Sequence, residues 1–245
     1  MPDFSVVVPI YNEEDSIAPL YFSLKRVMDS LKKPYEIIFI NDGSQDNTLE
    51  ALKGLTGESA GLCIIDLNMR RGKSQALQAG FDRAQGKIII TLDGDLQNDP
   101  ADIPRLLNKM EEGYDVVCGW RRIRRDPWAK KAASDVANYI RRIFFHENLH
   151  DVGCALRVYT AASIKGLRLY RQRHRFLTAL LKKQGARIGE VEVEHRFRRS
   201  GYSKYGTLVR LFSSIPDFCA LLREYYLSTP KISNPKTKNA DTREQ

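Results

Sequence analysis

The sequence predicts an α/β fold in which a mostly parallel sheet carries helices on both faces. In the first 120 residues, short β-rich runs alternate with amphipathic stretches, which is the order of repeated strand–helix–strand units. The runs at 5–8 and 88–90 are almost wholly β-branched and apolar, as strands buried on both faces are. A length of 245 residues with 42% hydrophobic content allows one domain with a large buried core.

The elements of this first half are expected in strict alternation along the chain. Strands are predicted at Phe4–Val8, Tyr35–Ile40, Leu62–Asp66, Lys87–Leu92 and Asp115–Cys118. Apolar residues at helical spacing predict helices at Glu13–Leu31, Gln45–Leu55, Lys73–Ala84 and Ala101–Glu112. Polar clusters follow these strands, and ligands of such sheets bind at the carboxyl ends of the strands. A ligand is therefore expected at that edge.

After residue 120 the regular alternation fades, and each element has to be assigned separately. We expect a basic loop at Trp120–Trp128, helices near Lys130–Phe145 and Arg175–Gly185, and strands near Cys154–Tyr159 and Ile188–Glu194. Residues 204–229 are predicted to form amphipathic helices broken at Pro216, and the polar residues 230–245 a disordered tail. The predicted domain plan is a main domain at 1–203, divided at residue 120, followed by these two segments.

Charge is distributed unevenly along the chain, whose formal net charge is +9. Residues 1–120 carry 12 Lys/Arg against 19 Asp/Glu, a net charge of −7, whereas residues 121–210 carry 22 against 7, a net charge of +15. A balance this basic indicates an anionic partner, which can be nucleic acid, a membrane surface or a phosphorylated substrate. An acidic half followed by a basic half suggests two tasks in one chain.

The cysteines and the chain start bear on the compartment. Cys63, Cys118, Cys154 and Cys219 lie far apart and form no CxxC pair, which argues against both a zinc site and a disulfide framework. A reducing compartment is therefore expected. The start, Met1-Pro2-Asp3, lacks the basic and apolar segments of a signal peptide. No stretch approaches the roughly 18–20 apolar residues that span a bilayer. A soluble or peripheral protein is expected.

The sharpest local signal is Asp93-Gly-Asp95, with Gln97 beyond it, directly after a buried predicted strand. Two carboxylates facing one crevice are costly unless a cation lies between them. Mg²⁺ and Mn²⁺ favour one or two carboxylates together with substrate phosphates, so these residues predict a metal–diphosphate site. The structural alternative is an acidic turn that caps a helix. We accept it for Asp99, because an Asp-Pro pair is typical of an N-cap followed by proline at N1.

Polar residues also follow the first two predicted strands. Asp42 can accept hydrogen bonds from ribose hydroxyls or a base N–H, and Gly43 permits the turn into the next helix. Tyr11 can stack on a base, and Glu13 can accept a hydrogen bond from it. The basic turn at 68–74 can bind a phosphate at a helix N-terminus, with an ordinary capped turn as an equal alternative. Neither a dinucleotide fingerprint nor a P-loop occurs in the sequence.

Taken in order, these segments resemble glycosyltransferase family 2, whose members have the GT-A fold. The resemblance rests on Val7–Glu13, Asn41–Ser44 and Asp93–Asp95, which are similar to the nucleotide-sugar-binding segments of that family. It narrows to polyprenyl-phosphate glycosyltransferases, such as dolichol-phosphate mannose synthases and bacterial undecaprenyl-phosphate sugar transferases, through Asp93–Pro100, Asp151–Arg157 and Gly201–Gly206. It covers about residues 3–227, and the ordered run of motifs is more specific than any one of them.

The resemblance implies roles for residues of the donor side. The residues that would hold the donor nucleotide are Pro9, Tyr11, Glu13, Asp42 and Asp93. Those that would bind Mg²⁺ or Mn²⁺, and through it the donor diphosphate, are Asp93, Asp95 and Gln97. Arg198 would meet the diphosphate directly. Asn41 stands where aspartate is commoner in the family, a departure that is not expected to abolish binding.

The resemblance also implies an acceptor side in the basic half. The acceptor phosphate would lie against Arg121, Lys130 and Ser134. Lys130 replaces a residue that is often arginine in such enzymes, and lysine lacks the fork-like phosphate contact of a guanidinium. Arg121, Lys130, Ser134 and Arg198 are therefore expected to act in catalysis together with Asp93 and Asp95.

The expected reaction is transfer of a sugar, with inversion, from a GDP- or UDP-linked donor to a polyprenyl phosphate. A hydroxyl acceptor needs a general base, whereas a phosphomonoester with a second pKa near ~6 is already mostly dianionic at neutral pH. Such an acceptor needs positive charge, which the basic half supplies. The expected partners are the nucleotide sugar, the polyprenyl phosphate and a membrane surface, without nucleic acid and with a homo-oligomer as an option. The expected location is the cytoplasmic face of a membrane, as a peripheral protein.

Two features are left with open interpretations. Apolar residues recur at spacings of three and four within 204–227, which suits an interfacial segment near a lipid acceptor. Packing of this stripe on the domain or on a partner chain is an equal alternative. His174 and His195 lie among arginines without a nearby ligand partner, so they are interpreted as structural or loosely substrate-contacting.

Three other functions compete with the leading hypothesis. A family 2 enzyme with a saccharide or protein acceptor would need a carboxylate base, and Asp151 is the available candidate. A nucleic-acid-binding module would use the segment of charge +15, but it leaves Asp93 and Asp95 unexplained. A processive polysaccharide synthase is disfavoured, because the sequence has neither a QxxRW segment nor a transmembrane stretch.

Overall fold

The structure is a computed structural model that describes residues 1–55, 61–122, 142–145 and 147–196, together with Phe218, Leu222, Arg223, Tyr225 and Tyr226. The predicted site residues Lys130, Ser134 and Arg198 lie outside this part of the chain. So do the greater part of the predicted 204–229 segment and the whole predicted tail.

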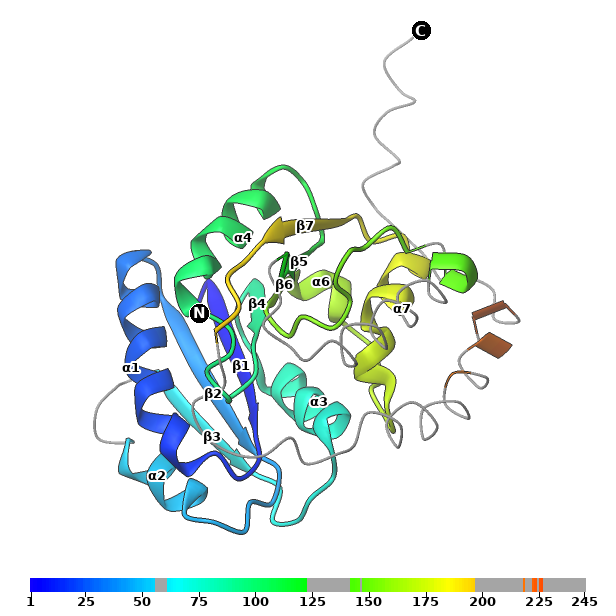
Figure 1. The fold of residues 1–245 in the computed structure, drawn as a ribbon. Helices are drawn as coiled ribbons and strands as arrows, with labels where there is room; N and C mark the ends of the chain where they lie inside the picture. The colour runs from blue at the N-terminus through cyan, green and yellow to red at the C-terminus, as the bar shows by residue number, and fades with distance from the viewer. Residues whose placement is uncertain are drawn as a thin grey trace, which may run out of the picture.

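The strands of the described residues join into one sheet, and the helices flank it (Figure 1). The strands are β1 (Phe4–Ile10), β2 (Tyr35–Asn41), β3 (Leu62–Asp66), β4 (Ile88–Thr91), β5 (Val116–Trp120), β6 (Arg157–Thr160) and β7 (Ile188–Glu192). The helices are α1 (Glu14–Ser30), α2 (Thr48–Gly54), α3 (Lys73–Arg83), α4 (Ile103–Glu111), α6 (Ala161–Ile164) and α7 (Leu177–Lys183). Two 3-10 turns, η1 (Pro100–Asp102) and η2 (Arg173–Phe176), precede α4 and α7.

The strand order is β3-β2-β1-β4-β6-β5-β7, and it confirms the predicted mostly parallel sheet. β1 pairs in parallel with β2 and β4, and β5 pairs in parallel with β7. β6 is the exception, because it runs antiparallel between β4 and β5. β2, β1 and β4 are consecutive neighbours, so their carboxyl ends meet at one edge of the sheet.

The core lies on both faces of the sheet because successive side chains of a strand point to opposite sides. In β1, Val6 and Val8 join the buried cluster under α1, α2 and α4, whereas Val7 joins the cluster under α3, α6 and α7. All three valines are fully buried. This two-sided burial explains why residues 6–10 of β1 form a continuous apolar run rather than an alternating one.

Several boundaries differ from the sequence-based expectation for local reasons. α2 begins at Thr48 rather than near Gln45, and the backbone N–H of Gln45 donates to the Asn12 side chain at 2.8 Å. This bond holds the turn after β2 against the turn after β1. β5 extends to Trp120, which was expected to open a basic loop. α6 and the turn η2 had no counterpart in the prediction.

β6 begins three residues later than expected, after a loop that surrounds a buried arginine. Arg157 is 6% exposed, its Nε donates to the carbonyl oxygen of Cys154 at 2.9 Å, and its Nη2 donates to that of Val152. Because the guanidinium takes these carbonyls as acceptors, the loop is held in a non-strand conformation up to Arg157.

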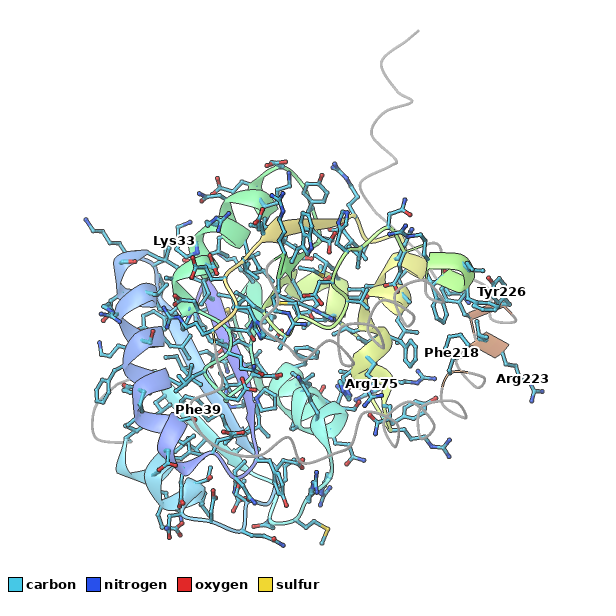
Figure 2. The ribbon with its side chains drawn as sticks, in the orientation of Figure 1. Lys33, Phe39, Arg175, Phe218, Arg223 and Tyr226 are labelled. Carbon is cyan, nitrogen blue, oxygen red and sulfur yellow. The ribbon has the colours of Figure 1, made fainter. Side chains whose placement is uncertain are left out.

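Residues of the C-terminal region pack on the domain through aromatic rings. The Phe218 ring lies 5.8 Å from that of Phe145, and the Tyr225 hydroxyl donates to the Phe145 carbonyl oxygen at 3.5 Å. Tyr226 is exposed, and Figure 2 shows it with Phe218 and Arg223 at the end of the molecule away from α1. Of the predicted apolar stripe the structure describes Leu222, which packs against the cluster under α3, α6 and α7, and Tyr226, which is exposed. None of the helices in the described part of the chain has the length and apolar character needed to cross a membrane.

Candidate functional site

The candidate site lies where β2, β1 and β4 end side by side. The register pairs Ile10 of β1 with Asn41 of β2, and the backbone N–H of Asp42 donates to the Ile10 carbonyl oxygen at 2.8 Å. Asp93 follows β4 closely at the same edge. The structure therefore brings together Tyr11 and Glu13, Asp42, and the Asp93–Gln97 turn, as the parallel topology predicted.

The turn after β4 holds the two predicted metal-binding carboxylates. Asp93 Oδ1 forms an ion pair with Lys73 Nζ at the start of α3. Asp95 Oδ1 accepts a hydrogen bond from the backbone N–H of Gln97 at 3.2 Å. Gly94 lies close to β1, because a Cβ at this position would lie 2.3 Å from the end of the Ile10 side chain. The turn is thus pressed onto the end of the neighbouring strand.

The donor chemistry of this turn fits a hard divalent cation. The described residues contain no group of three or more His, Cys, Asp or Glu side chains placed to hold a metal by themselves. Mg²⁺ and Mn²⁺ take one or two carboxylates and complete their shell with substrate phosphate oxygens and water. Asp93, Asp95 and the amide oxygen of Gln97 are hard oxygen ligands of the required kind.

Asp99 has the capping role that the sequence indicated. Its Oδ1 accepts a hydrogen bond from the backbone N–H of Ala101 at 3.0 Å, and Pro100 occupies the first position of η1. Its other oxygen forms an ion pair with Arg196. The contacts of Asp99 are therefore those of a helix cap and an ion pair.

The residues predicted to hold the nucleotide lie mostly in the turns after β1 and β2. Asp42 is 5% exposed, and its carboxylate accepts hydrogen bonds from the backbone N–H groups of Arg71 at 2.7 Å and Gly72 at 2.9 Å. The backbone N–H of Glu13 donates to the Thr48 hydroxyl at 2.9 Å. The guanidinium of Arg70 lies over the Tyr11 ring, 4.3 Å from its centre. Pro9 lies within β1, in register with Ile40.

The basic turn at 68–74 lies directly on the turn after β2. Gly43 has φ +65°, and a Cβ there would lie 2.3 Å from the backbone carbon of Met69. Gly72, with φ +90°, precedes α3 and uses its backbone N–H on Asp42. The structure thus places this turn against Asp42 and against the turn after β2.

On the basic side, Arg121 is held by Asp151. Arg121 Nε donates to Asp151 Oδ2 at 2.7 Å, and Nη2 donates to Oδ1 at 3.0 Å, which is the bidentate geometry of a strong ion pair. The backbone N–H groups of Arg121 and Gly153 donate to the same carboxylate at 3.2 and 3.1 Å. The side chains are 12% and 2% exposed, so this pair is nearly buried.

Two histidines belong to the site in a way that their sequence neighbours did not reveal. His195 is 7% exposed, and its Nε2 lies 3.3 Å from Nε2 of Gln97. His174 Nδ1 lies 2.8 Å from the hydroxyl of Ser74, the second residue of α3. These contacts join residues about 100 positions apart, so no local motif carried a signal for them.

Two buried cysteines behind the site are chemically quiet. Burial raises the pKa of the Cys118 thiol to about 12 and that of Cys154 to about 11. Because the thiolate is the reactive form, neither side chain is a nucleophile at neutral pH.

The sequence model of "Glycosyl transferase family 2" matches residues 5–168, which include the turns after β1, β2 and β4. The chain belongs to this family. The match confirms the resemblance that rested on the segments around Glu13, Asp42 and Asp93.

Curated relatives of this family 2 chain have names that include a polyprenyl phosphate. It is 40% identical over 225 residues to "Dodecaprenyl-phosphate galacturonate synthase" of Rhizobium johnstonii, covering 90% of this chain and 66% of the relative. It is 39% identical over 220 residues to "Undecaprenyl-phosphate 4-deoxy-4-formamido-L-arabinose transferase" of Serratia proteamaculans, covering 89% and 67%. The chain thus spans about two-thirds of the length of these relatives.

Solved structures confirm the GT-A fold of this family 2 chain. Glucosyl-3-phosphoglycerate synthase from Mycobacterium tuberculosis, solved in complex with Mn²⁺ and uridine-diphosphate-glucose, matches with a TM-score of 0.71. The match covers 91% of this chain and 79% of the other, at 19% identity. At this identity the similarity concerns the fold.

Proposed function

We propose that this chain transfers a sugar, with inversion, from a UDP- or GDP-linked donor to a polyprenyl phosphate, with the help of Mg²⁺ or Mn²⁺. The product would be a polyprenyl-phosphate monosaccharide. Family membership and relatives named as dodecaprenyl- and undecaprenyl-phosphate enzymes support this reaction. A solved neighbour that contains Mn²⁺ and uridine-diphosphate-glucose supports the metal and the donor class.

The observation that carries the acceptor assignment is the pairing of Arg121 with Asp151. A hydroxyl acceptor would need a carboxylate base, for which Asp151 was the candidate. Both oxygens of this carboxylate accept from Arg121, and the side chain is 2% exposed. Asp151 is therefore better suited to orienting a guanidinium than to removing a proton. A guanidinium fixed in this way suits an anionic acceptor.

In the proposed reaction the chain mainly binds and orients two anions. Tyr11, Glu13 and Asp42 would hold the nucleotide, while Asp93, Asp95 and Gln97 would hold the cation. The bound cation would supply charge neutralisation for the leaving diphosphate. Arg121 would hold the lipid phosphate, and because a phosphomonoester is mostly dianionic at neutral pH, its oxygen attacks the anomeric carbon without loss of a proton.

The residues proposed here beyond the described part of the chain complete the two subsites. Lys130 and Ser134 would join Arg121 on the acceptor phosphate, and Arg198 would meet the donor diphosphate. The resemblance of the surrounding segments to polyprenyl-phosphate glycosyltransferases supports these roles.

We also propose that the protein acts as a peripheral protein at the cytoplasmic face of a membrane, where its acceptor lies. Ile143, Phe144 and Tyr226 are exposed, and Tyr226 donates a hydrogen bond to the Phe144 carbonyl oxygen at 2.6 Å. Arg142 and Arg223 are exposed in the same two segments. Apolar rings beside cations suit the interface of an anionic bilayer.

The direct test incubates the purified protein with a panel of UDP- and GDP-sugars, Mn²⁺ or Mg²⁺, and either a short polyprenyl phosphate or a saccharide acceptor. We expect a lipid-linked monosaccharide with at least one donor, and its loss on chelation of the metal. Transfer to the saccharide with no lipid-linked product from any donor would overturn the proposal. An Asp95→Ala variant is expected to lose the reaction while keeping its folded circular dichroism spectrum.

A further inference from the structure

One loop contacts Tyr11, Asp42 and Asp93, which belong to the proposed donor site. It consists of the residues between β3 and α3 together with Lys73, the first residue of α3. Arg70 lies over the Tyr11 ring, the backbone N–H groups of Arg71 and Gly72 donate to Asp42, and Lys73 pairs with Asp93. The contact of Gly43 with the backbone of Met69 keeps this loop close to the site.

In the ion pair between Lys73 and Asp93, the lysine ammonium occupies a carboxylate that the divalent ion would need. The side chains are 35% and 37% exposed, so the pair lies at the surface of the site and within reach of solvent. A half-exposed pair of this kind is weak and exchangeable. Lysine is suited to such an exchange, because its ammonium is a compact charge on a flexible stem.

The Lys73 ammonium and a divalent metal ion compete for the negative charge of the Asp93 carboxylate. A divalent ion that binds before the nucleotide must compete with Lys73 for this carboxylate and is repelled by the ammonium charge. A diphosphate brings negative charge to the same place, which gives the ammonium another partner and adds oxygen ligands for the ion. Binding of the diphosphate and of the metal then favour one another through Lys73.

We infer that Lys73 is a donor-site residue that occupies Asp93 in the donor-free protein and is exchanged for the divalent metal when a nucleoside diphosphate binds. Lys73 thereby couples metal binding to diphosphate binding and keeps metal affinity low without a donor. This inference rests on the proposed function, because it assumes a metal–diphosphate site at Asp93 and Asp95. It goes beyond that function in assigning an order to the binding of the two ligands.

The test measures Mn²⁺ binding by the electron paramagnetic resonance signal of the free ion, with and without UDP or GDP, in the wild-type protein and in Lys73→Met. We expect the donor-free protein to bind Mn²⁺ more tightly in Lys73→Met, by a factor within the usual range of allosteric coupling, about 5- to 150-fold. We also expect weaker binding of the nucleotide and a smaller effect of the nucleotide on Mn²⁺ affinity. Lys87→Met is the matched control, because Lys87 pairs with Asp3 at the opposite edge of the sheet.

The outcomes separate this inference from the proposed function. Unchanged donor-free Mn²⁺ affinity in Lys73→Met, with nucleotide-dependent Mn²⁺ binding intact in the wild type, would overturn the role of Lys73 and leave the function standing. Failure of the wild type to bind Mn²⁺ with either nucleotide would overturn the donor site itself. A thermal melt of each variant shows whether it is folded, and Lys73→Arg, which keeps the positive charge, is expected to keep donor-free Mn²⁺ affinity close to wild type.

Discussion

Replacing Asp151 by asparagine tests how the acceptor side is held together. Among the described residues, the carboxylate accepts hydrogen bonds from the backbone N–H, Nε and Nη2 of Arg121 and from the backbone N–H of Gly153. An asparagine offers one acceptor oxygen, and its amide nitrogen would face donors instead of accepting from them. The Asp151→Asn change therefore removes a charge and leaves the guanidinium of Arg121 poorly paired.

The size of the effect follows from burial. Removing one partner of a buried ion pair costs about 3–5 kcal/mol, because the other charge stays desolvated. The Arg121 side chain keeps 12% exposure, so some solvation remains and the expected loss is about 3 kcal/mol. For a domain of this size each kcal/mol lowers Tm by about 2–4 °C, which gives a fall of about 6–12 °C.

The assay is urea unfolding of the wild type, Asp151→Asn, Arg121→Met and the double variant. We expect the double variant to lose less free energy of unfolding than the sum of the single variants, because neither charge is then left unpaired. A double-mutant cycle that is additive within about 0.5 kcal/mol would refute the coupling. A single variant with unchanged stability would equally contradict the pairing and would return Asp151 to the role of a free base.

Three further predictions follow from the packing around the site. Asn41→Asp should lower the free energy of unfolding by about 1–3 kcal/mol in urea, because the Asn41 amide donates to Asp66 at 3.0 Å and a carboxylate there would face a carboxylate; equal stability would contradict this. Gly80→Ala should lower the free energy of unfolding in urea by about 1–3 kcal/mol, because the added Cβ would lie 2.3 Å from the Val7 side chain in β1; a variant more stable than the wild type would contradict this close packing. Native protein at pH 8 should resist iodoacetamide at Cys118 and Cys154, whose pKa values burial raises to about 12 and 11; peptide mass spectrometry showing rapid alkylation at either would contradict their burial.

The parallel part of the sheet could be predicted because each of its strands has a recognisable pattern in its own residues. The valines of β1 and the isoleucines of β4 are buried from both sides, and that requirement leaves a continuous apolar run in the sequence. β6 could not be recognised as an antiparallel strand inside the sheet. It opens with Arg157, a charged residue that is tolerated only because carbonyl groups of the preceding loop accept its hydrogen bonds.

In the candidate site, too, some features could be recognised from neighbouring residues in the sequence, whereas others depend on contacts between distant residues. Asp93, Asp95 and Gln97 could be proposed as metal ligands from the sequence because they lie in one turn after one strand. The partners of these residues could not be found in this way, because Lys73 reaches Asp93 and His195 reaches Gln97 only through the fold. Sequence reasoning treated Asp151 as an available base for the same reason, since its pairing with Arg121 spans 30 residues.

The most direct test of the proposed reaction compares two acceptors that differ only in the phosphate. The protein, Mn²⁺ and an accepted nucleotide sugar are incubated with a short polyprenyl phosphate or with the matching polyprenol, and lipid-linked sugar is measured by mass spectrometry. If a lipid phosphate is the nucleophile, the polyprenyl phosphate becomes glycosylated and the polyprenol does not. Transfer to the polyprenol at a comparable rate, or to neither lipid while a saccharide is glycosylated, would contradict the account.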